Sequence, residues 1–169
     1  VAIIERFGKY QKVANSGIHI RLPFGIDSIA ARIQLRLLQS DIVVETKTKD
    51  NVFVMMNVAT QYRVNEQSVT DAYYKLMRPE SQIKSYIEDA LRSSVPKLTL
   101  DELFEKKDEI ALEVQHQVAE EMTTYGYIIV KTLITKVEPD AEVKQSMNEI
   151  NAAQRKRVAA QELAEADKI

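Results

Sequence analysis

The chain ends in DAEVKQSMNEINAAQRKRVAAQELAEADKI (residues 140–169), a stretch that predicts one long helix. Pro139 fixes a backbone φ suited to a first helical turn, and neither Pro nor Gly follows it. Val143, Met147 and Ile150 recur at spacings of four and three residues, the pattern of a helix that packs along one stripe. After Ile150 the stripe thins to alanines and Leu163.

A helix with so thin an apolar stripe gains little by folding onto its own domain. We therefore predict that it is the start of a coiled coil or of a ring-forming helix, in which a neighbour supplies the missing contacts. The predicted oligomerisation residues are Val143, Met147, Ile150 and Leu163. The alternative is an exposed terminal helix stabilised only by its alanines.

Composition limits the other possibilities. With 169 residues, 45% of them hydrophobic, the chain has room for one domain and an appendage. A net charge of −2 gives no reason to expect nucleic acid as a partner. The chain has no Cys, and no apolar run is long enough to span a bilayer. Because it begins at Val1 instead of Met, we expect a fragment of a longer protein, in which any membrane anchor before Val1 would lie outside this sequence.

The first half of the chain is rich in strand patterns. Turn residues after Val1–Tyr10 predict a first hairpin, and the alternating residues 18–22 predict a half-buried strand that ends at Pro23. A further alternating stretch at 32–37 predicts another strand. Residues 42–46 and 52–64 predict two long antiparallel strands joined by a polar loop.

From Asn65 the apolar period changes to that of helices. Asn65 is a candidate cap for a helix that runs to Met77, and Pro79 begins a second helix that Pro96 ends. Thr99 and Glu102 have the spacing of a capping box at the start of a long third helix. Residues 127–137 predict a late strand with two apolar faces, which we expect to be buried. The order of elements predicts an α+β domain with a mostly antiparallel sheet, packed helices and a long C-terminal helix.

Candidate catalytic and metal sites are weak. Ser94 and Lys97 have a Ser-x-x-Lys spacing, but Pro96 breaks the helix that this geometry needs. The set Glu113, His116 and Glu120 shares a helical face, for which a solvated surface is the simpler interpretation. The basic triplet 155–157 wraps around its helix and is also interpreted as solvated, with anionic lipid as the alternative. We predict no catalytic, cofactor-binding or metal-binding residue.

The apolar tip Leu22, Pro23 and Phe24 lies between predicted strands. Such a tip can dip into a membrane interface, or it can pack under a neighbouring loop. We predict that these three residues contact the membrane.

Several motifs together resemble the stomatin, prohibitin, flotillin and HflK/C superfamily, also called the SPFH or Band 7 domain. They are ERFGKY (5–10), VETKTKDN (44–51), VPKL (95–98), LDELF (100–104) and MNEINAAQR (147–155), the last being similar to the hypersensitive-induced-reaction branch. The resemblance covers essentially the whole chain. It implies an SPFH domain at residues 1–138, with a strand-rich lobe at 1–64 and a helical lobe at 65–138, followed at 139–169 by an oligomerisation helix.

The resemblance also implies a function. It implies a non-enzymatic scaffold at the membrane, here expected to be a bacterial plasma membrane, which forms large homo-oligomers that organise lipids and client proteins such as membrane proteases or channels. The alternative is a soluble adaptor that binds a membrane protein without touching lipid. Liposome binding separates the two hypotheses.

Overall fold

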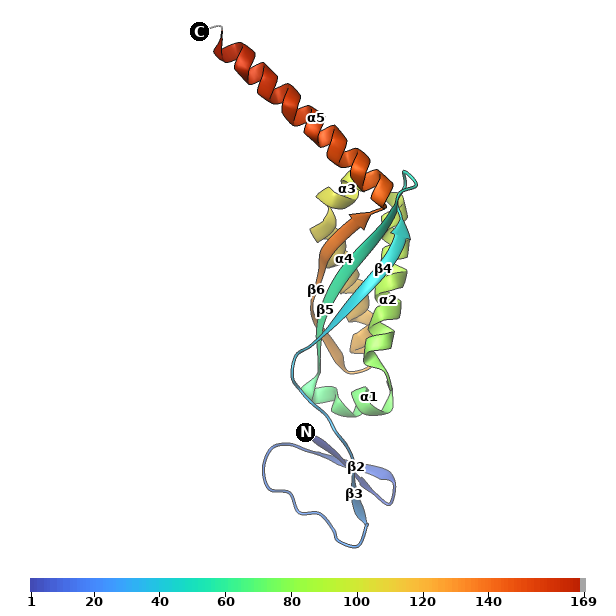
Figure 1. Ribbon diagram of the computed structural model, residues 1–169. Helices are drawn as coiled ribbons and strands as arrows, with labels where there is room; N and C mark the ends of the chain where they lie inside the picture. The colour runs from blue at the N-terminus through green and yellow to red at the C-terminus, as the bar shows by residue number, and fades with distance from the viewer. Residues whose placement is uncertain (168–169) are drawn as a thin grey trace.

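The molecule is elongated, with a small sheet at one end and a long helix projecting from the other (Figure 1). The structure is a computed structural model that describes residues 1–167. Two antiparallel sheets of three strands each, together with helices, make an α+β fold, as the sequence predicted. The strands are β1 (Ala2–Arg6), β2 (Lys9–Ala14), β3 (Asp27–Arg32), β4 (Leu38–Lys47), β5 (Phe53–Val64) and β6 (Tyr127–Pro139).

The small lobe is the sheet with strand order β2-β1-β3. The predicted first hairpin is confirmed as β1 and β2. The predicted strand at 18–22 is wrong, because this segment belongs to a loop from 15 to 26 in which Ile18 is fully exposed. The predicted strand at 32–37 is also wrong: β3 ends at Arg32, and residues 33–37 link the two sheets. In both segments apolar and polar residues alternate as in a half-buried strand, although the segments are an exposed loop and a link between the sheets.

The body of the molecule is built on the sheet β4-β5-β6. The predicted long antiparallel pair is confirmed, with Leu38 opposite Tyr62 and Lys47 opposite Phe53. Alternate residues of β5 point into the core, where Met56 and Tyr62 are buried.

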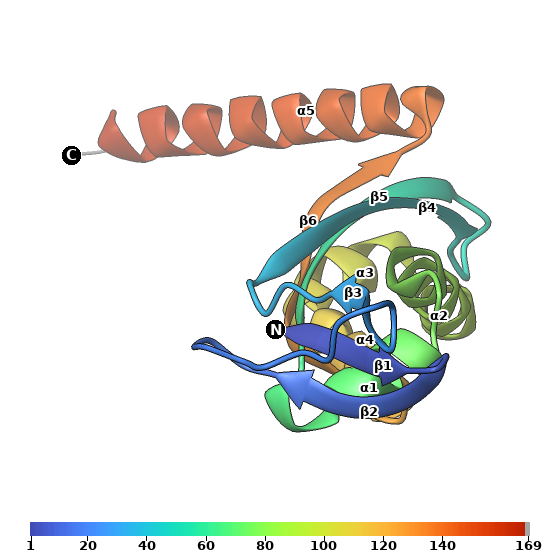
Figure 2. The ribbon, with the colours of Figure 1, turned by 90° about the horizontal axis from the view of Figure 1, so that it is seen from below.

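The helices cover one side of this sheet (Figure 2). They are α1 (Val69–Tyr74), α2 (Pro79–Ser94), α3 (Leu100–Glu105) and α4 (Lys107–Thr123), with short 3₁₀ turns at Glu66–Ser68 and Val95–Lys97. The predicted capping box of Thr99 and Glu102 is confirmed. Asn65 accepts from the Gln67 amide, but it caps the 3₁₀ turn and not α1, which begins after Ser68. The first helix stops short of Met77, which is 91% exposed, and the predicted third helix is two helices.

The prediction that the late strand is buried on both faces is wrong. β6 lies at an edge of the sheet, and its outer face exposes Val130 and Leu133 while Ile129 and Ile134 are buried. The same outer face exposes Val43, Phe53 and Met55 on the neighbouring strands. The helices pack on the other side of the sheet, so this outer face stays exposed even though it is only partly polar.

Few contacts join the small lobe to the body. Ile3 on β1 is completely buried and belongs to the same apolar cluster as the body core. The Tyr74 hydroxyl on α1 donates to Glu5, with 2.6 Å between the oxygens. The Tyr73 hydroxyl donates to the backbone carbonyl of Ala30 at 3.4 Å. Within residues 1–167 no hydrogen bond between two backbone groups joins the small lobe to the body sheet or to the helices.

The last helix, α5 (Ala141–Ala166), leaves the body directly after β6. It has no buried residue, and it leans outward beyond the outline of the body (Figures 1 and 2). The division into lobes at 1–64, 65–138 and 139–169 stays a proposal, since strands on both sides of residue 64 share one sheet. Lys168 and Ile169, the end of the last range, lie outside the described residues.

Candidate functional site

The lower end of the small lobe carries exposed aromatic side chains. Phe7 is 78% exposed in the turn between β1 and β2, and Phe24 is 98% exposed in the loop 15–26. The Phe7 amide donates to the carbonyl of Ile26 at 3.1 Å, so the two turns lie at the same end of the sheet. Phe7, Leu22 and Phe24 form the apolar tip of the structure, which differs from the predicted set by including Phe7 and leaving out Pro23.

Both aromatic residues of the tip hold an uncommon backbone conformation. Phe7 has φ of 50° and Phe24 has φ of 63°, and each is followed by a Gly that also has positive φ. Left-handed conformations cost a non-Gly residue about 1 kcal/mol, and Asn tolerates them better than Phe. The chain therefore exposes two large apolar rings at positions where a smaller polar residue would stabilise the fold.

Asp27 organises the loop that carries the tip. Its side chain is only 4% exposed, and it pairs with Arg6 at 2.8 Å between Oδ1 and Nε. Its Oδ2 accepts from the backbone amide of Leu22 at 2.9 Å. The hydrogen bond from Arg6, and then the one from the Leu22 amide, hold the pKa of the Asp27 carboxyl below its usual value of 3.8. This role was not predicted, because Asp27 is the first residue of β3, a strand that the sequence analysis missed.

We expect Asp27→Asn to loosen the loop without unfolding the body. The amide of Leu22 should exchange faster with deuterium, because Arg6 loses its charged partner. Since the pKa of Asp27 is lower in the folded chain, its contribution is complete above about pH 4 and is lost as pH falls through the lowered pKa. The wild type should therefore show acid-dependent loosening that the variant lacks. Asp41→Asn, at an exposed site on β4, is the control and should leave Leu22 exchange unchanged.

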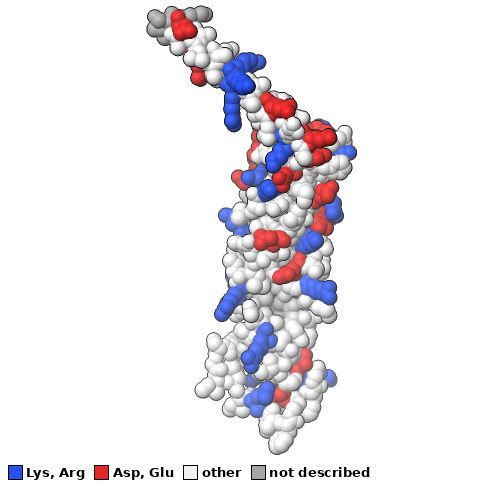
Figure 3. All heavy atoms as spheres, viewed as in Figure 1, with Lys and Arg blue, Asp and Glu red and all other residues white. Residues whose placement is uncertain are grey.

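The small lobe is basic around its apolar tip. Residues 1–32 contain five Lys or Arg and two carboxylates, and both carboxylates are engaged by neighbours. Figure 3 shows white spheres at the lower end of the molecule with basic side chains just above them. The arrangement of apolar groups below a basic rim suits an anionic surface.

The structure places the predicted contact residues Leu22, Pro23 and Phe24 on the exposed loop, with Leu22 41% exposed. Sequence reasoning missed Phe7, Ile18 and Ile20, which are also exposed in this lobe. For Phe7 the available signal was Gly8, since Gly in a two-residue hairpin loop indicates positive φ and places its neighbour in an exposed turn.

Helix α5 carries the predicted oligomerisation residues on two faces. Val143 and Met147 are half-buried against the core, and Ile150 is 59% exposed on the same face. We call these three residues the proximal stripe. Leu163 follows Ile150 by thirteen residues, which at about 100° per residue places their side chains roughly 140° apart. The four predicted residues therefore do not form one continuous stripe.

A second stripe begins where the first one ends. Its members recur at spacings of four, three and four residues, and the set is Ala152, Lys156, Ala159 and Leu163, here called the distal stripe. Leu163 is 68% exposed. Val158, which is 51% exposed, lies between the two stripes and was missed by the sequence analysis. One helix thus offers different apolar faces near its start and near its end.

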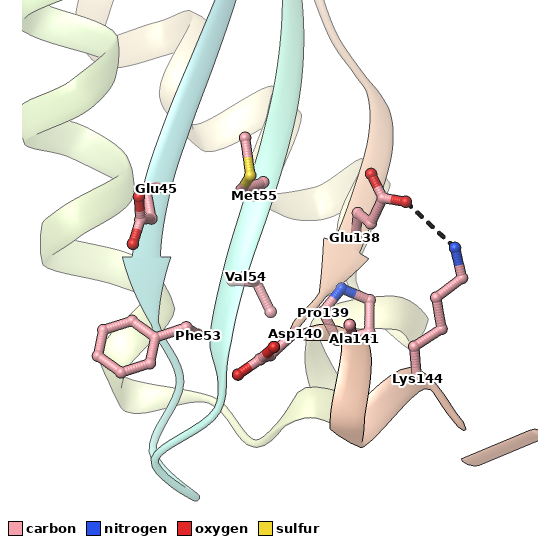
Figure 4. Close-up of a pocket in the computed structure, with 9 residues that line it drawn as sticks. All are labelled: Glu45, Phe53, Val54, Met55, Glu138, Pro139, Asp140, Ala141 and Lys144. Atoms are coloured by element: carbon pink, nitrogen blue, oxygen red, sulfur yellow. Dashed lines mark hydrogen bonds and ion pairs between the residues drawn. The ribbon is translucent and has the colours of Figure 1, made fainter. Parts of the chain in front are cut away.

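A groove of about 530 Å³ lies where α5 leaves the sheet (Figure 4). Its floor contains Phe53 and Met55 from β5, which are about half exposed. Glu45 on β4 and Asp140 at the start of α5 add negative charge. Glu138 also lines the groove, but Lys136 and Lys144 hold the pKa of its carboxyl below the usual range.

The structure does not support the candidate catalytic pair or the candidate metal site. α2 ends at Ser94, and Lys97 lies in the 3₁₀ turn that follows, so the pair does not share one α-helix. The set Glu113, His116 and Glu120 is exposed on α4. Within residues 1–167 no group of three potential ligands could hold a metal ion, and no helix is long and apolar enough to cross a membrane.

The fold and these surfaces define an elongated α+β domain with a projecting helix and an exposed apolar end. Sequence comparison identifies the family: the SPFH domain / Band 7 family model matches residues 1–168. The chain belongs to this family, which confirms the resemblance drawn from its motifs.

The chain is also similar to several curated proteins. It is 42% identical to hypersensitive-induced response protein 4 of Arabidopsis thaliana over 169 residues, which cover the whole chain and 58% of that protein. It is 29% identical to stomatin homologues of Pyrococcus abyssi and Pyrococcus horikoshii, covering 99% of the chain and 61% and 62% of those proteins. The chain thus spans about three fifths of the length of these relatives.

Proposed function

We propose that this chain is part of a non-enzymatic scaffold that lies on a membrane through its apolar tip and self-associates through α5. The observation that carries the proposal is the pair of exposed Phe side chains at positive φ, which the fold holds at a cost. Membership of the SPFH / Band 7 family supports it. The plasma membrane of a bacterium, and clients such as membrane proteases or channels, are the finer parts of the proposal.

Membrane contact is tested by Phe24→Asn. Asn accepts the left-handed conformation better than Phe, so the free energy of unfolding should rise, by up to about 1 kcal/mol. Flotation with vesicles of phosphatidylglycerol and phosphatidylethanolamine should fall at the same time, because the apolar ring is gone. A gain in stability with a loss of binding separates lipid contact from simple unfolding.

The control is Leu112→Asn, which removes an apolar side chain that is 56% exposed on α4. It should leave flotation unchanged. If wild-type chain and Phe24→Asn float equally, the tip is not the contact. If neither floats, the soluble adaptor is favoured instead.

Self-association is tested on the proximal stripe. Met147→Asp with Ile150→Asp should shift the chain to smaller species in analytical ultracentrifugation, since charges would replace the apolar contacts with a neighbour. Gln145→Asp with Asn148→Asp adds the same charge to the same helix outside the proximal stripe and should sediment like the wild type. Equal sedimentation of all three chains would assign the contact elsewhere.

A further inference from the structure

The groove at the base of α5 has two carboxylates that form no ion pair within the described residues 1–167. Neither Glu45 nor Asp140 forms a salt bridge within residues 1–167, whereas Glu138 pairs with Lys136 and Lys144. Between them the groove floor exposes Phe53 and Met55. An apolar floor with an acidic rim is complementary to an apolar helix face with basic flanks.

The distal half of α5 has that character. Lys156 lies within the distal stripe, and Arg155 and Arg157 lie about 100° to either side of it. None of these three cations forms a salt bridge in the part of the chain that the structure describes. Figure 3 shows a group of basic side chains partway along the projecting helix. The triplet therefore places one cation within the distal stripe and one on either side of it.

A chain cannot bring its own distal stripe to its own groove. Leu163 follows Asp140 by 23 residues in a continuous helix, which separates them by about 35 Å along the axis. Because α5 leans outward beyond the body, its distal half overhangs the space beside the molecule (Figures 1 and 2). A second copy displaced along the direction of the α5 axis would bring its groove to that half.

We propose that the distal stripe of one copy docks in the groove of the next copy, with the basic triplet facing Glu45 and Asp140. The proposal rests on the self-association proposed above and names the surfaces that meet. The two surfaces differ, so the contact is head-to-tail. Each added copy leaves one groove and one distal stripe open, so growth continues as an open filament unless the rotation between copies closes it into a ring.

The absence of Cys allows a direct test by disulfide formation. One population of chains carries Met55→Cys and the other carries Leu163→Cys. On mild oxidation the mixture should form the 55–163 disulfide, identified by mass spectrometry. A matched mixture with Leu112→Cys in place of Met55→Cys places the thiol on α4 and should give little product. Equal yields from the two mixtures, or no 55–163 product, would overturn the proposal.

Charge exchange tests the same contact and its direction. Lys156→Glu and Glu45→Lys should each lower self-association of the wild-type chain in sedimentation, and the double variant should recover it. Asp41→Lys, on the same strand as Glu45 but outside the groove, should have no effect. The two single variants change the net charge in opposite directions, so a loss of self-association in both is not expected from a general change of net charge.

The results separate this proposal from the one on which it depends. If the wild type self-associates and Lys156→Glu and Glu45→Lys do not weaken it, the groove is not the contact while self-association through α5 stands. If Met147→Asp with Ile150→Asp leaves assembly intact while Lys156→Glu removes it, the distal stripe is the contact and the proximal stripe is not.

Discussion

Gly126→Ala is expected to lower the free energy of unfolding by about 3 kcal/mol. Gly126 joins α4 to β6 with φ of 79°, a conformation that costs other residues about 1–2 kcal/mol. A Cβ atom built there would lie 2.4 Å from the carbonyl oxygen of Ser68 and 3.1 Å from the amide nitrogen of Ala72. Relief of such a clash costs a further 1–3 kcal/mol or so, because backbone must move.

Urea denaturation followed by circular dichroism measures this loss. Gly25→Ala is the matched control, since Gly25 has a similar φ of 75° and no heavy atom within 4 Å of the added Cβ. It should lose only the conformational part. An equal loss in the free energy of unfolding for the two variants would mean that the segment around Ser68 moves away from the added Cβ more easily than the structure indicates.

Ile3→Ala is expected to cost about 3 kcal/mol, within the range of Ile or Leu truncations at fully buried sites. Ile3 is completely buried and joins the apolar cluster of the small lobe to that of the body. The cavity should weaken the attachment of the small lobe first. Hydrogen exchange should therefore rise in β1, β2 and β3 more than in β5.

Ile29→Ala removes the same side chain atoms from a site that is 39% exposed in the same lobe. It should cost well below half as much as Ile3→Ala. A similar loss in the two variants would mean that Ile3 stabilises the small lobe itself and not its attachment to the body.

Local patterns predicted the body of the fold well. The alternation in β5, the caps at Asn65 and Thr99 and the stop at Gly126 each depend on a few neighbouring residues. They failed where the outcome depends on distant segments. The apolar residues of the loop 15–26 alternate like a strand, but β3 and β2 already occupy both sides of β1.

The candidate surfaces were predicted only in part. Leu22 and Phe24 were expected at an exposed tip, and the structure adds Phe7 from a different turn, which no sequence period connects to them. The groove at Glu45, Phe53 and Asp140 was not predicted at all, because it joins residues from three elements. The change of apolar face along α5 was present in the sequence and was overlooked when Leu163 was grouped with Ile150.

The narrow join between the two sheets has a mechanical consequence. Segment 33–37 is the covalent link, and among residues 1–167 only side chains such as Ile3 and Tyr74 add to it. A rotation of the small lobe on the body would therefore break no ladder hydrogen bond in either sheet and would be resisted by the packing of Ile3. In the membrane-bound assembly proposed above, a small rotation at this join would let each copy follow bilayers of different curvature.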